Sequence, residues 1–287
     1  MADSGVRLLG LGDNAVDIYA DKGVMFPGGN AVNVAVHGKR LGASAAYLGC
    51  LANDTYGVLL VDAMTAEGID LSHCRRIDGE NAHVLVKHRK GDRVFLKSTP
   101  GVRGQYELNA DDFAYIQGFD TVHTSIGSDN EPAIPAIAGA AALLSYDFSN
   151  RWTKDHMVRL GPLIDIAFVS FPDRSDEKCA DALREWSSSG ARIVVMTRGE
   201  DGSLAYSDGT LYRQEIIPAK IVDTLGAVDG FIAGFLMTFV QGGTIPLALR
   251  NGAQAAAATC GSLGAFGRGV PFEKAIFKPG SPEKIGG

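Results

Sequence analysis

The sequence has few of the residues that build metal or disulfide sites. Only four cysteines occur, at positions 50, 74, 179 and 260, with no Cys-x-x-Cys pair, and the six histidines form no His-Glu-x-x-His motif. A zinc site made of side chains and a disulfide framework are therefore not expected. Isolated cysteines in a chain of 287 residues are typical of a reduced cytoplasmic protein.

Dense basic runs and long apolar runs are also missing. The net charge is −6, and no segment gathers Lys and Arg closely enough to indicate a nucleic-acid surface. No apolar run reaches the roughly 20 residues of a membrane-spanning helix, and the N-terminus shows no signal-peptide pattern. We therefore expect a cytoplasmic protein that binds neither nucleic acid nor membrane. An acidic chain can still bind a nucleotide, because backbone amides and one or two cations suffice locally.

The order of apolar segments predicts an α/β fold in a single domain spanning residues 1–287. Short apolar runs alternate with helical patterns, at residues 6–11, 119–124, 142–148, 164–170 and 192–197. This alternation indicates a mainly parallel sheet covered by helices on both faces. Strand and hairpin signals at about 13–27 and 81–104 predict a small β-sheet lid. Because the C-terminal segment is rich in Gly, Pro and Lys, residues 268–287 are expected to form a flexible tail.

The most informative segment is Asp223-Thr-Leu-Gly-Ala-Val-Asp229-Gly-Phe231, a turn of small residues that leads into an apolar helix from Phe231. Backbone N–H groups at a helix start are unpaired and carry the positive end of the helix dipole, so they can hold a phosphate or a developing oxyanion. Asp229 is unsuited to bind an anion but suited to act as a base beside one. The segment therefore predicts phosphoryl transfer to a hydroxyl. The alternative is that Asp229 only stabilises the helix dipole.

A second segment, Gly28-Gly29-Asn30-Ala-Val-Asn33, indicates a polyhydroxyl ligand. Paired glycines let the backbone come close to a ligand. Asn30 and Asn33 lie one turn apart at the start of an apolar helix, so both amides can face one point. Each amide offers a donor and an acceptor, which suits sugar hydroxyls. The alternative is that Asn30 merely caps a helix after a glycine turn.

The turn Gly10-Leu-Gly-Asp-Asn-Ala15 matches a dinucleotide-binding fingerprint, which would indicate an oxidoreductase. Its context does not fit, because Asp13 would face the pyrophosphate and the residues up to Pro27 cannot form the long helix that the fingerprint requires. We expect Asp13 and Asp17 to face a polyhydroxyl substrate, the alternative being a solvated strand end. Gly38-Lys-Arg40 resembles the end of a P-loop but lacks its upstream Gly and its Ser or Thr.

Taken in this order, the motifs resemble those of the ribokinase-like (PfkB) family of carbohydrate kinases. The resemblance covers residues 7–266 and is carried by the Gly-Gly-Asn-Ala-Val-Asn-Val-Ala run at 28–35 and the Asp-Thr-x-Gly-Ala-x-Asp run at 223–229. It implies a three-layer αβα sandwich with a β lid that often pairs with a second subunit. It also implies ATP-dependent, Mg²⁺-assisted transfer to a sugar hydroxyl.

The resemblance assigns roles to individual residues. The implied catalytic base and anion hole are Asp229 and the backbone of Gly226, Ala227 and Val228. The implied sugar-binding positions are Asp13, Asp17, Gly28, Gly29, Asn30 and Asn33. The implied ATP-binding positions are Thr197, Gly199, Gly202, Asn251 and Gly252. Many relatives also bind a monovalent cation such as K⁺ near the position of Asp223.

Within the family, several segments resemble the fructoselysine 6-kinases, at 12–19, 28–36, 92–95 and 146–152. The expected acceptor is therefore a primary hydroxyl, O6 of a fructosamine such as fructoselysine. Another ketose or a nucleoside is the alternative acceptor.

The sequence departs from the family pattern at two places. Val228 stands where the family has glycine, so either the loop is displaced or, if φ is negative, the valine is merely tight. This leaves a second hypothesis, a kinase-like protein that binds a sugar or nucleotide without efficient transfer. Ser170-Phe-Pro-Asp173 replaces an Asn-x-x-Glu motif that organises Mg²⁺, and its shorter side chains predict weaker metal binding.

Overall fold

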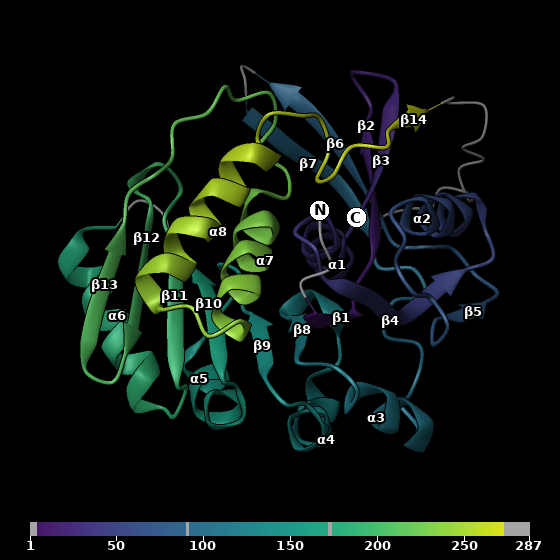
Figure 1. The fold of residues 1–287 in the computed structure, drawn as a ribbon. Helices are drawn as coiled ribbons and strands as arrows, with labels where there is room; N and C mark the ends of the chain where they lie inside the picture. The colour runs from purple at the N-terminus through teal and green to yellow at the C-terminus, as the bar shows by residue number, and fades with distance from the viewer. Residues whose placement is uncertain (1–4, 90–91, 172–173, 273–287) are drawn as a thin grey trace, which may run out of the picture.

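The structure is a computed structural model that describes residues 5–89, 92–171 and 174–272. Its centre is a nine-stranded sheet in the order β13-β12-β11-β10-β9-β8-β1-β4-β5 (Figure 1). The strands are β1 (Arg7–Gly12), β4 (Ser44–Ala52), β5 (Arg75–Ile77), β8 (Thr121–Ser125), β9 (Leu144–Asp147), β10 (Ile166–Ser170), β11 (Ile193–Thr197), β12 (Ser203–Ser207) and β13 (Thr210–Gln214). All neighbours from β11 to β5 are parallel, and β12 and β13 are antiparallel additions.

Both faces of this sheet are buried, as its apolar strands require. In β10, Ile166 and Phe168 point into one core, whereas Ala167 and Val169 point into the other. Because side chains alternate along a strand, a run that is apolar at every position can only serve a sheet covered on both sides. The mainly parallel sheet predicted from the sequence is confirmed.

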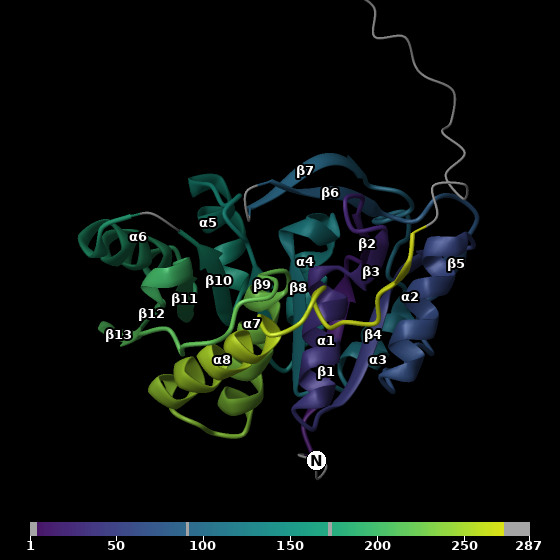
Figure 2. The ribbon, with the colours of Figure 1, turned by 90° about the horizontal axis from the view of Figure 1, so that it is seen from above.

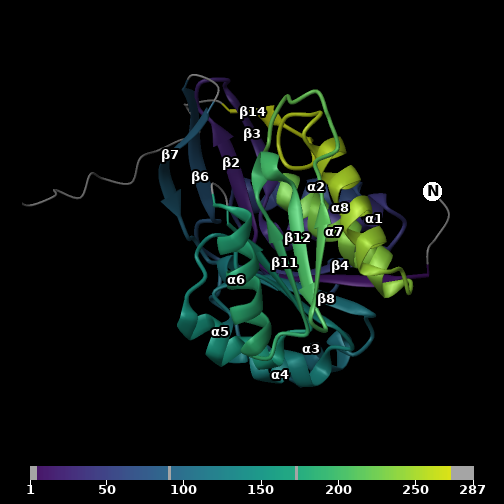
Figure 3. The same cartoon turned by 90° about the vertical axis from the view of Figure 1, so that its left-hand side faces the viewer.

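Helices cover the two faces in separate groups. The first core contains residues of α1 (Asn30–Arg40), α2 (Thr55–Ala66), α7 (Ala227–Val240) and α8 (Ile245–Thr259). The second contains residues of α3 (Ala110–Ile116), α4 (Ile134–Ala140), α5 (Lys154–Leu160) and α6 (Asp176–Ser188). Figure 3 shows α7 and α8 on one side of the sheet and α6 on the other. Short 3₁₀ turns are η1 (Ile126–Ser128), η2 (Glu131–Ala133), η3 (Gly161–Leu163) and η4 (Gly199–Asp201).

A second, smaller sheet has the order β14-β3-β2-β6-β7. Its strands are β2 (Ala15–Tyr19), β3 (Val24–Gly28), β6 (His83–Arg89), β7 (Asp92–Thr99) and β14 (Val270–Pro271), and only β2 and β6 pair in parallel. Tyr19, Phe26 and Val86 pack against Leu225 and Leu263, which belong to loops before α7 and after α8. The small sheet therefore rests on these loops, at one end of the large sheet (Figures 1 and 2).

Two expectations from the sequence need correction. The helix expected from Phe231 begins at Ala227, so Asp229 lies inside its first turn. Apolar spacing marks only the buried part of a helix, and residues 227–229 are half-buried. Residues 270–272 do not belong to the flexible tail expected from residue 268, because Val270 and Pro271 pair with β3 and the N–H of Phe272 donates to the carbonyl of Gly23. Residues 273–287 lie outside the described part.

The topology places polar residues together at one edge of the large sheet. The chain runs from β1 to β4 on one side and later to β8 on the other, so β1 lies at a switch point of the strand order. Ligands of open α/β sheets bind outside the carboxyl ends of the strands at such a point. Polar residues stand at the carboxyl ends of five parallel strands, namely Asp13, Ser125, Asp147, Ser170 and Thr197.

The dinucleotide fingerprint is excluded by the same segment of chain. The residues after Gly12 form β2 and β3 rather than a helix. In the described parts of the chain, moreover, no helix combines the length and apolar character needed to cross a membrane.

Candidate active site

The first turn of α7 presents backbone N–H groups at the carboxyl edge of the large sheet. Gly226 is its N-cap with φ 75°, and a Cβ there would lie 2.6 Å from the Cβ of Ala265, so the position requires glycine. The N–H of Gly230 makes the first bond of the helix, to the carbonyl of Gly226 at 2.8 Å. The N–H groups of Val228 and Asp229 precede this bond and have no acceptor inside the helix.

The carboxylate of Asp229 is held by the two asparagines at the start of α1. Its Oδ1 accepts from Nδ2 of Asn30 at 2.8 Å, and its Oδ2 accepts from Nδ2 of Asn33 at 2.6 Å. Within the described residues, both hydrogen bonds of this carboxylate come from α1 and none comes from a backbone N–H of α7. Asp229 is therefore positioned by α1, which argues against a role limited to the dipole of α7.

Asn30 connects Asp229 to a second buried carboxylate. Its Nδ2 also donates to Oδ2 of Asp147 at 3.0 Å, so one amide group bridges two acids. Its Oδ1 lies 2.8 Å from Nε2 of His123, whose Nδ1 lies 2.8 Å from the hydroxyl of Ser145. An amide oxygen can only accept, so Nε2 carries the proton and Ser145 donates to Nδ1. His123 thus turns the NH₂ group of Asn30 toward the two acids.

Burial sets the protonation of this cluster. Burial raises the pKa of Asp229 from its ordinary 3.8 to about 6, with the charge of Asp13 adding to the effect and the amide donors opposing it. Burial raises the pKa of Asp147 to about 7, and the charge of Asp229 adds to it. His123 is fully buried, which lowers its pKa to about 3 and keeps the ring neutral. Asp229 is therefore ionised near pH 7 yet more basic than an exposed carboxylate.

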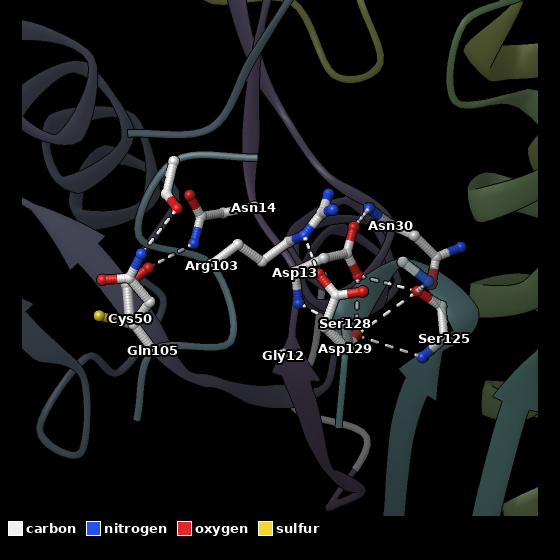
Figure 4. Close-up of polar contacts among 12 residues, drawn as sticks. Gly12, Asp13, Asn14, Asn30, Cys50, Arg103, Gln105, Ser125, Ser128 and Asp129 are labelled. Atoms are coloured by element: carbon white, nitrogen blue, oxygen red, sulfur yellow. Dashed lines mark hydrogen bonds and ion pairs between the residues drawn. The ribbon is translucent and has the colours of Figure 1, made fainter. Parts of the chain in front are cut away.

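Asp13 fixes the start of α1 (Figure 4). Its Oδ2 accepts from the N–H of Asn30 at 2.7 Å, and its Oδ1 accepts from the N–H of Ala31 at 3.2 Å. The hydroxyls of Ser125 and Ser128 also donate to Oδ1, at 3.0 and 3.1 Å. Gly29, the N-cap of α1, has no side chain, so Asp13 caps this helix from the end of β1. Asp13 is only 6% exposed, which rules out a solvated strand end.

Asp17 and Gly28 lie close to Asn33, whose amide donates to Asp229. A Cβ at Gly28 would lie 2.6 Å from Oδ2 of Asp17 and 3.7 Å from Oδ1 of Asn33, so a side chain there would crowd the carboxylate of Asp17. The buried Oδ1 of Asn33 has no hydrogen-bond partner among the described residues. Buried polar atoms are almost always paired, so this oxygen is suited to a hydroxyl of a ligand.

Position 29 requires glycine for a structural reason. Its φ is 105°, and a Cβ there would lie 2.4 Å from Cα of Asn14. The side chain of Asn14 is satisfied within the protein, since it donates to Tyr47 and to the carbonyl of Cys50 and accepts from Asn81. Gly29 therefore allows the close approach of α1 to the turn after β1.

The expected nucleotide positions lie on the other half of the molecule, around β11 and α8. Thr197 ends β11, and its hydroxyl is 3.0 Å from that of Ser170 at the end of β10. Gly199 and Gly202 follow in the turn to β12 with φ of 62° and 78°. A Cβ at Gly202 would lie 2.3 Å from the carbonyl oxygen of Gln214, whereas one at Gly199 would meet nothing within 4 Å. Close packing therefore requires glycine at position 202, whereas Gly199 faces open space.

Asn251 and Gly252 have contacts that join the last two helices. Nδ2 of Asn251 donates to the hydroxyl of Thr238 on α7 at 2.9 Å. A Cβ at Gly252 would lie 2.9 Å from the carbonyl oxygen of Phe231. Both residues therefore serve the packing of α8 on α7.

Comparisons with known proteins agree with this geometry. Residues 9–268 match the pfkB family of carbohydrate kinases. The chain belongs to this family. It is 38% identical to fructosamine kinase FrlD of Bacillus subtilis over 97% of the chain and 99% of that protein. It is 37% identical to fructoselysine 6-kinase of Escherichia coli over 89% of the chain and 98% of that protein. The structure of Arabidopsis thaliana ribokinase with ribose and ATP has the same fold, with a TM-score of 0.78 at 22% identity over 93% and 95% of the two chains.

The chain is thus an ATP-dependent carbohydrate kinase, and its Val228 can be assessed as part of such an enzyme. Val228 is the second residue of α7 and is not among the residues with positive φ. A valine adopts helical φ readily, so the start of α7 is not strained by its side chain. A displaced loop, one structural reason for inefficient transfer, is therefore removed, and the valine is merely tight. Asp173, the other departure, lies outside the described residues.

Sequence reasoning missed four polar residues of this kinase site. His123 and Asp147 act on Asn30, and Ser125 and Ser128 act on Asp13. A search for polar residues at the carboxyl ends of all parallel strands would have found Asp147 and Ser125, whereas His123 lies within β8 and carries no such signal. Ser128 lies in the 3₁₀ turn that follows β8, where a serine is common for local reasons.

The pH dependence of the kinase should separate activity from stability. If Asp229 acts as the base, it must be ionised, so kcat/KM is expected to fall as the pH drops through about 6. The folded-state pKa values of Asp229 and Asp147 lie above 3.8, so the folded protein binds these protons more tightly than the unfolded chain. Their contribution to stability is therefore greater at pH 5 than at pH 8. Rate profiles and melting temperatures measure the two effects, and an acidic limb near pH 4 would contradict the assignment.

Removing the imidazole of His123 should disturb the orientation of Asn30. In His123→Leu, kcat is expected to fall by about 10-fold or more, because misplaced catalytic groups cost up to ~10²-fold. KM for ATP should stay near the wild-type value. His123→Gln retains an N–H donor and should recover part of the loss, and Ser145→Ala, which keeps the bond from His123 to Asn30, should lose less. Steady-state kinetics measure these effects, and a wild-type kcat in His123→Leu would refute the positioning role.

Proposed function

We propose that this kinase transfers the γ-phosphoryl group of ATP to O6 of a fructosamine such as fructoselysine, with Asp229 as general base. One observation carries the proposal: the carboxylate of Asp229 is held by Asn30 and Asn33 within the first turn of α7. A base and a group of N–H donors for phosphate oxygens therefore lie together at the start of α7.

The proposed reaction needs only one proton transfer by the protein. A carboxylate oxygen of Asp229 accepts the proton of the primary hydroxyl, while the hydroxyl oxygen forms a bond to the γ-phosphorus. The bond between the γ-phosphorus and the oxygen that bridges it to the β-phosphate breaks, which releases ADP. We infer that the N–H groups of Gly226, Ala227 and Val228 face the transferring oxygens. That of Ala227 donates to the carbonyl of Thr224 at 3.3 Å in the protein alone, so it must turn from this acceptor to reach a phosphate oxygen. General-base assistance typically contributes ~10²–10⁴-fold, and positioning with charge stabilisation supplies the rest.

The sugar is proposed to lie against Asp17, Gly28, Gly29 and Asn33. The unpaired Oδ1 of Asn33 supports this, because a sugar hydroxyl can donate to it without displacing another bond. Oδ2 of Asp13 makes one bond, to Asn30, and can accept a second donor. Asn30 has both sides of its amide occupied, so we infer that it positions the base and contacts the sugar little.

A fructosamine is favoured over a simple ketose or a nucleoside by charge. Its secondary amine is a cation at neutral pH, and the site holds four carboxylates, at positions 13, 17, 147 and 229. An acidic site attracts a cationic acceptor and offers nothing comparable to a neutral sugar. The names of the similar proteins, fructosamine kinase and fructoselysine 6-kinase, point to the same substrate class.

ATP is proposed to bind near Thr197, Gly199 and Gly202, with its base toward Asn251 and Gly252. The open space at Gly199 supports this position. Within the described residues, no group of three or more His, Cys, Asp or Glu side chains could hold a metal. Mg²⁺ usually keeps several waters and takes substrate phosphates as ligands, so we infer that it enters with the triphosphate and neutralises its charge.

We infer that the small sheet is a lid on a single domain and that a homodimer forms through it. The support is that β7 is an edge strand and that Leu96 on it is 52% exposed. A cytoplasmic location is supported by the four cysteines, all of which are free thiols.

Replacing Asp229 tests the proposed function. Asp229→Asn should lower kcat for fructoselysine by at least ~10²-fold, because the base is lost. Binding of the sugar, measured by the rise in melting temperature, should be nearly unchanged.

Asp111→Asn is the matched control, since it also removes an acid from the first turn of a helix, α3, on an exposed surface. It should cost at most about 1 kcal/mol of stability and leave kcat unchanged. Similar kinetics in the two variants would mean that Asp229 serves only the helix dipole.

A further inference from the structure

The carboxylate of Asp223 is buried below the small sheet and occupied by donors of the protein itself. Its Oδ2 accepts from the hydroxyl of Tyr19 at 2.5 Å and from the N–H of Gly264 at 3.0 Å. Its Oδ1 accepts from the N–H of Leu225 at 3.1 Å. The residue is only 5% exposed, so no solvent competes for these bonds.

The three donors come from three separate segments. Tyr19 ends β2 of the small sheet, Leu225 belongs to the turn before α7, and Gly264 follows α8. Tyr19 is fully buried and its ring lies 5.1 Å from that of Phe26, so its hydroxyl has a fixed direction. Asp223 therefore ties the small sheet to the turn that leads into α7.

The contacts of Asp223 also affect the orientation of the proposed anion hole. The bond from Leu225 to Asp223 spans two residues, which is the geometry of an Asx-turn that bends the chain. The next residue, Gly226, is the N-cap of α7 and begins the proposed anion hole. Whatever holds Asp223 therefore also sets the direction of the N–H groups at positions 226–228.

A monovalent cation does not fit at this carboxylate. Such an ion needs lone pairs directed at it, and three of the roughly four lone-pair sites of a carboxylate are already taken by N–H and O–H donors. Hydrogens of positive partial charge would also face the ion in a buried site, where such repulsion is screened little. The expectation of a K⁺ site at Asp223 is therefore not supported by the contacts of this chain.

We propose that the hydroxyl of Tyr19 takes the place of a monovalent cation at Asp223, so that this kinase needs no such cation for activity. Tyr19 is then a positioning residue of the reaction: it touches neither substrate nor ATP and acts through Asp223 on the start of α7. The proposal rests on phosphoryl transfer at Asp229, and not on which sugar accepts the phosphate.

The first test compares monovalent cations on the wild-type enzyme. The kcat and the melting temperature are measured in KCl, NaCl and tetramethylammonium chloride at equal ionic strength, with ATP·Mg and fructoselysine. The three salts are expected to agree within about twofold for kcat and within error for melting temperature. A several-fold activation by KCl, or a rise in melting temperature specific to KCl, would overturn the proposal. The comparison of melting temperatures needs no turnover, so it tests the proposal even if fructoselysine is not the acceptor.

The second test removes one oxygen atom. Tyr19→Phe keeps the ring packing and should lower kcat by about 10-fold, because a misoriented anion hole can cost ~10²–10³-fold when a donor is lost entirely. KM for the sugar and the melting temperature should change little.

Tyr115→Phe is the control, because it removes a similar bond, from the hydroxyl of Tyr115 to Oδ2 of Asp70 at 2.7 Å, on the opposite helical layer. Its kcat should equal that of the wild type. A normal kcat in Tyr19→Phe, or an equal loss in both variants, would overturn the positioning role.

Discussion

A carboxylate withdrawn from water is costly unless donors surround it, and the proposed active site depends on how that cost is met at the half-buried Asp229. Two amides from the first turn of α1 reach its two oxygens. They stabilise the ionised form, while burial keeps its pKa at about 6. The result is a carboxylate that is charged at neutral pH and still accepts a proton, as a general base must. Neither the helix dipole nor the burial alone would produce both properties.

The same requirement explains why so many elements meet at this point. The amide of Asn30 can serve Asp229 only if His123 fixes its orientation and Asp13 fixes the start of α1. On the other side of the base, Asp223 fixes the turn before α7, and Tyr19 of the small sheet fixes Asp223. We infer that the large sheet positions the proposed base through α1, and that the small sheet positions the proposed anion hole. The first turn of α7 is where the two supports join.

Much of this arrangement could be predicted from the sequence, for definite physical reasons. Apolar strands alternating with helices specify a parallel sheet, and this sheet brings the carboxyl ends of its strands to one edge, which places Asp13 there. The glycines and asparagines at 28–33 and the acid at 229 also have local patterns. The contacts between these residues have no local pattern in the sequence. His123 is a polar residue inside an apolar strand, and Tyr19 meets Asp223 across 204 positions of sequence, so only the fold shows what either does. The true start of α7 could not be predicted because its first turn is half-buried and carries no apolar pattern.

The position of the phosphate on the product tests most directly whether Asp229 activates a primary hydroxyl of a fructosamine. The enzyme is incubated with ATP·Mg and fructoselysine, and the product is examined by phosphorus–proton correlation NMR. Phosphorus should couple to the two methylene protons of C6 and to no other sugar proton. Coupling to a ring methine proton, or release of phosphate from ATP without any phosphorylated sugar, would contradict the role of Asp229 as the base that its two asparagines hold against a primary hydroxyl.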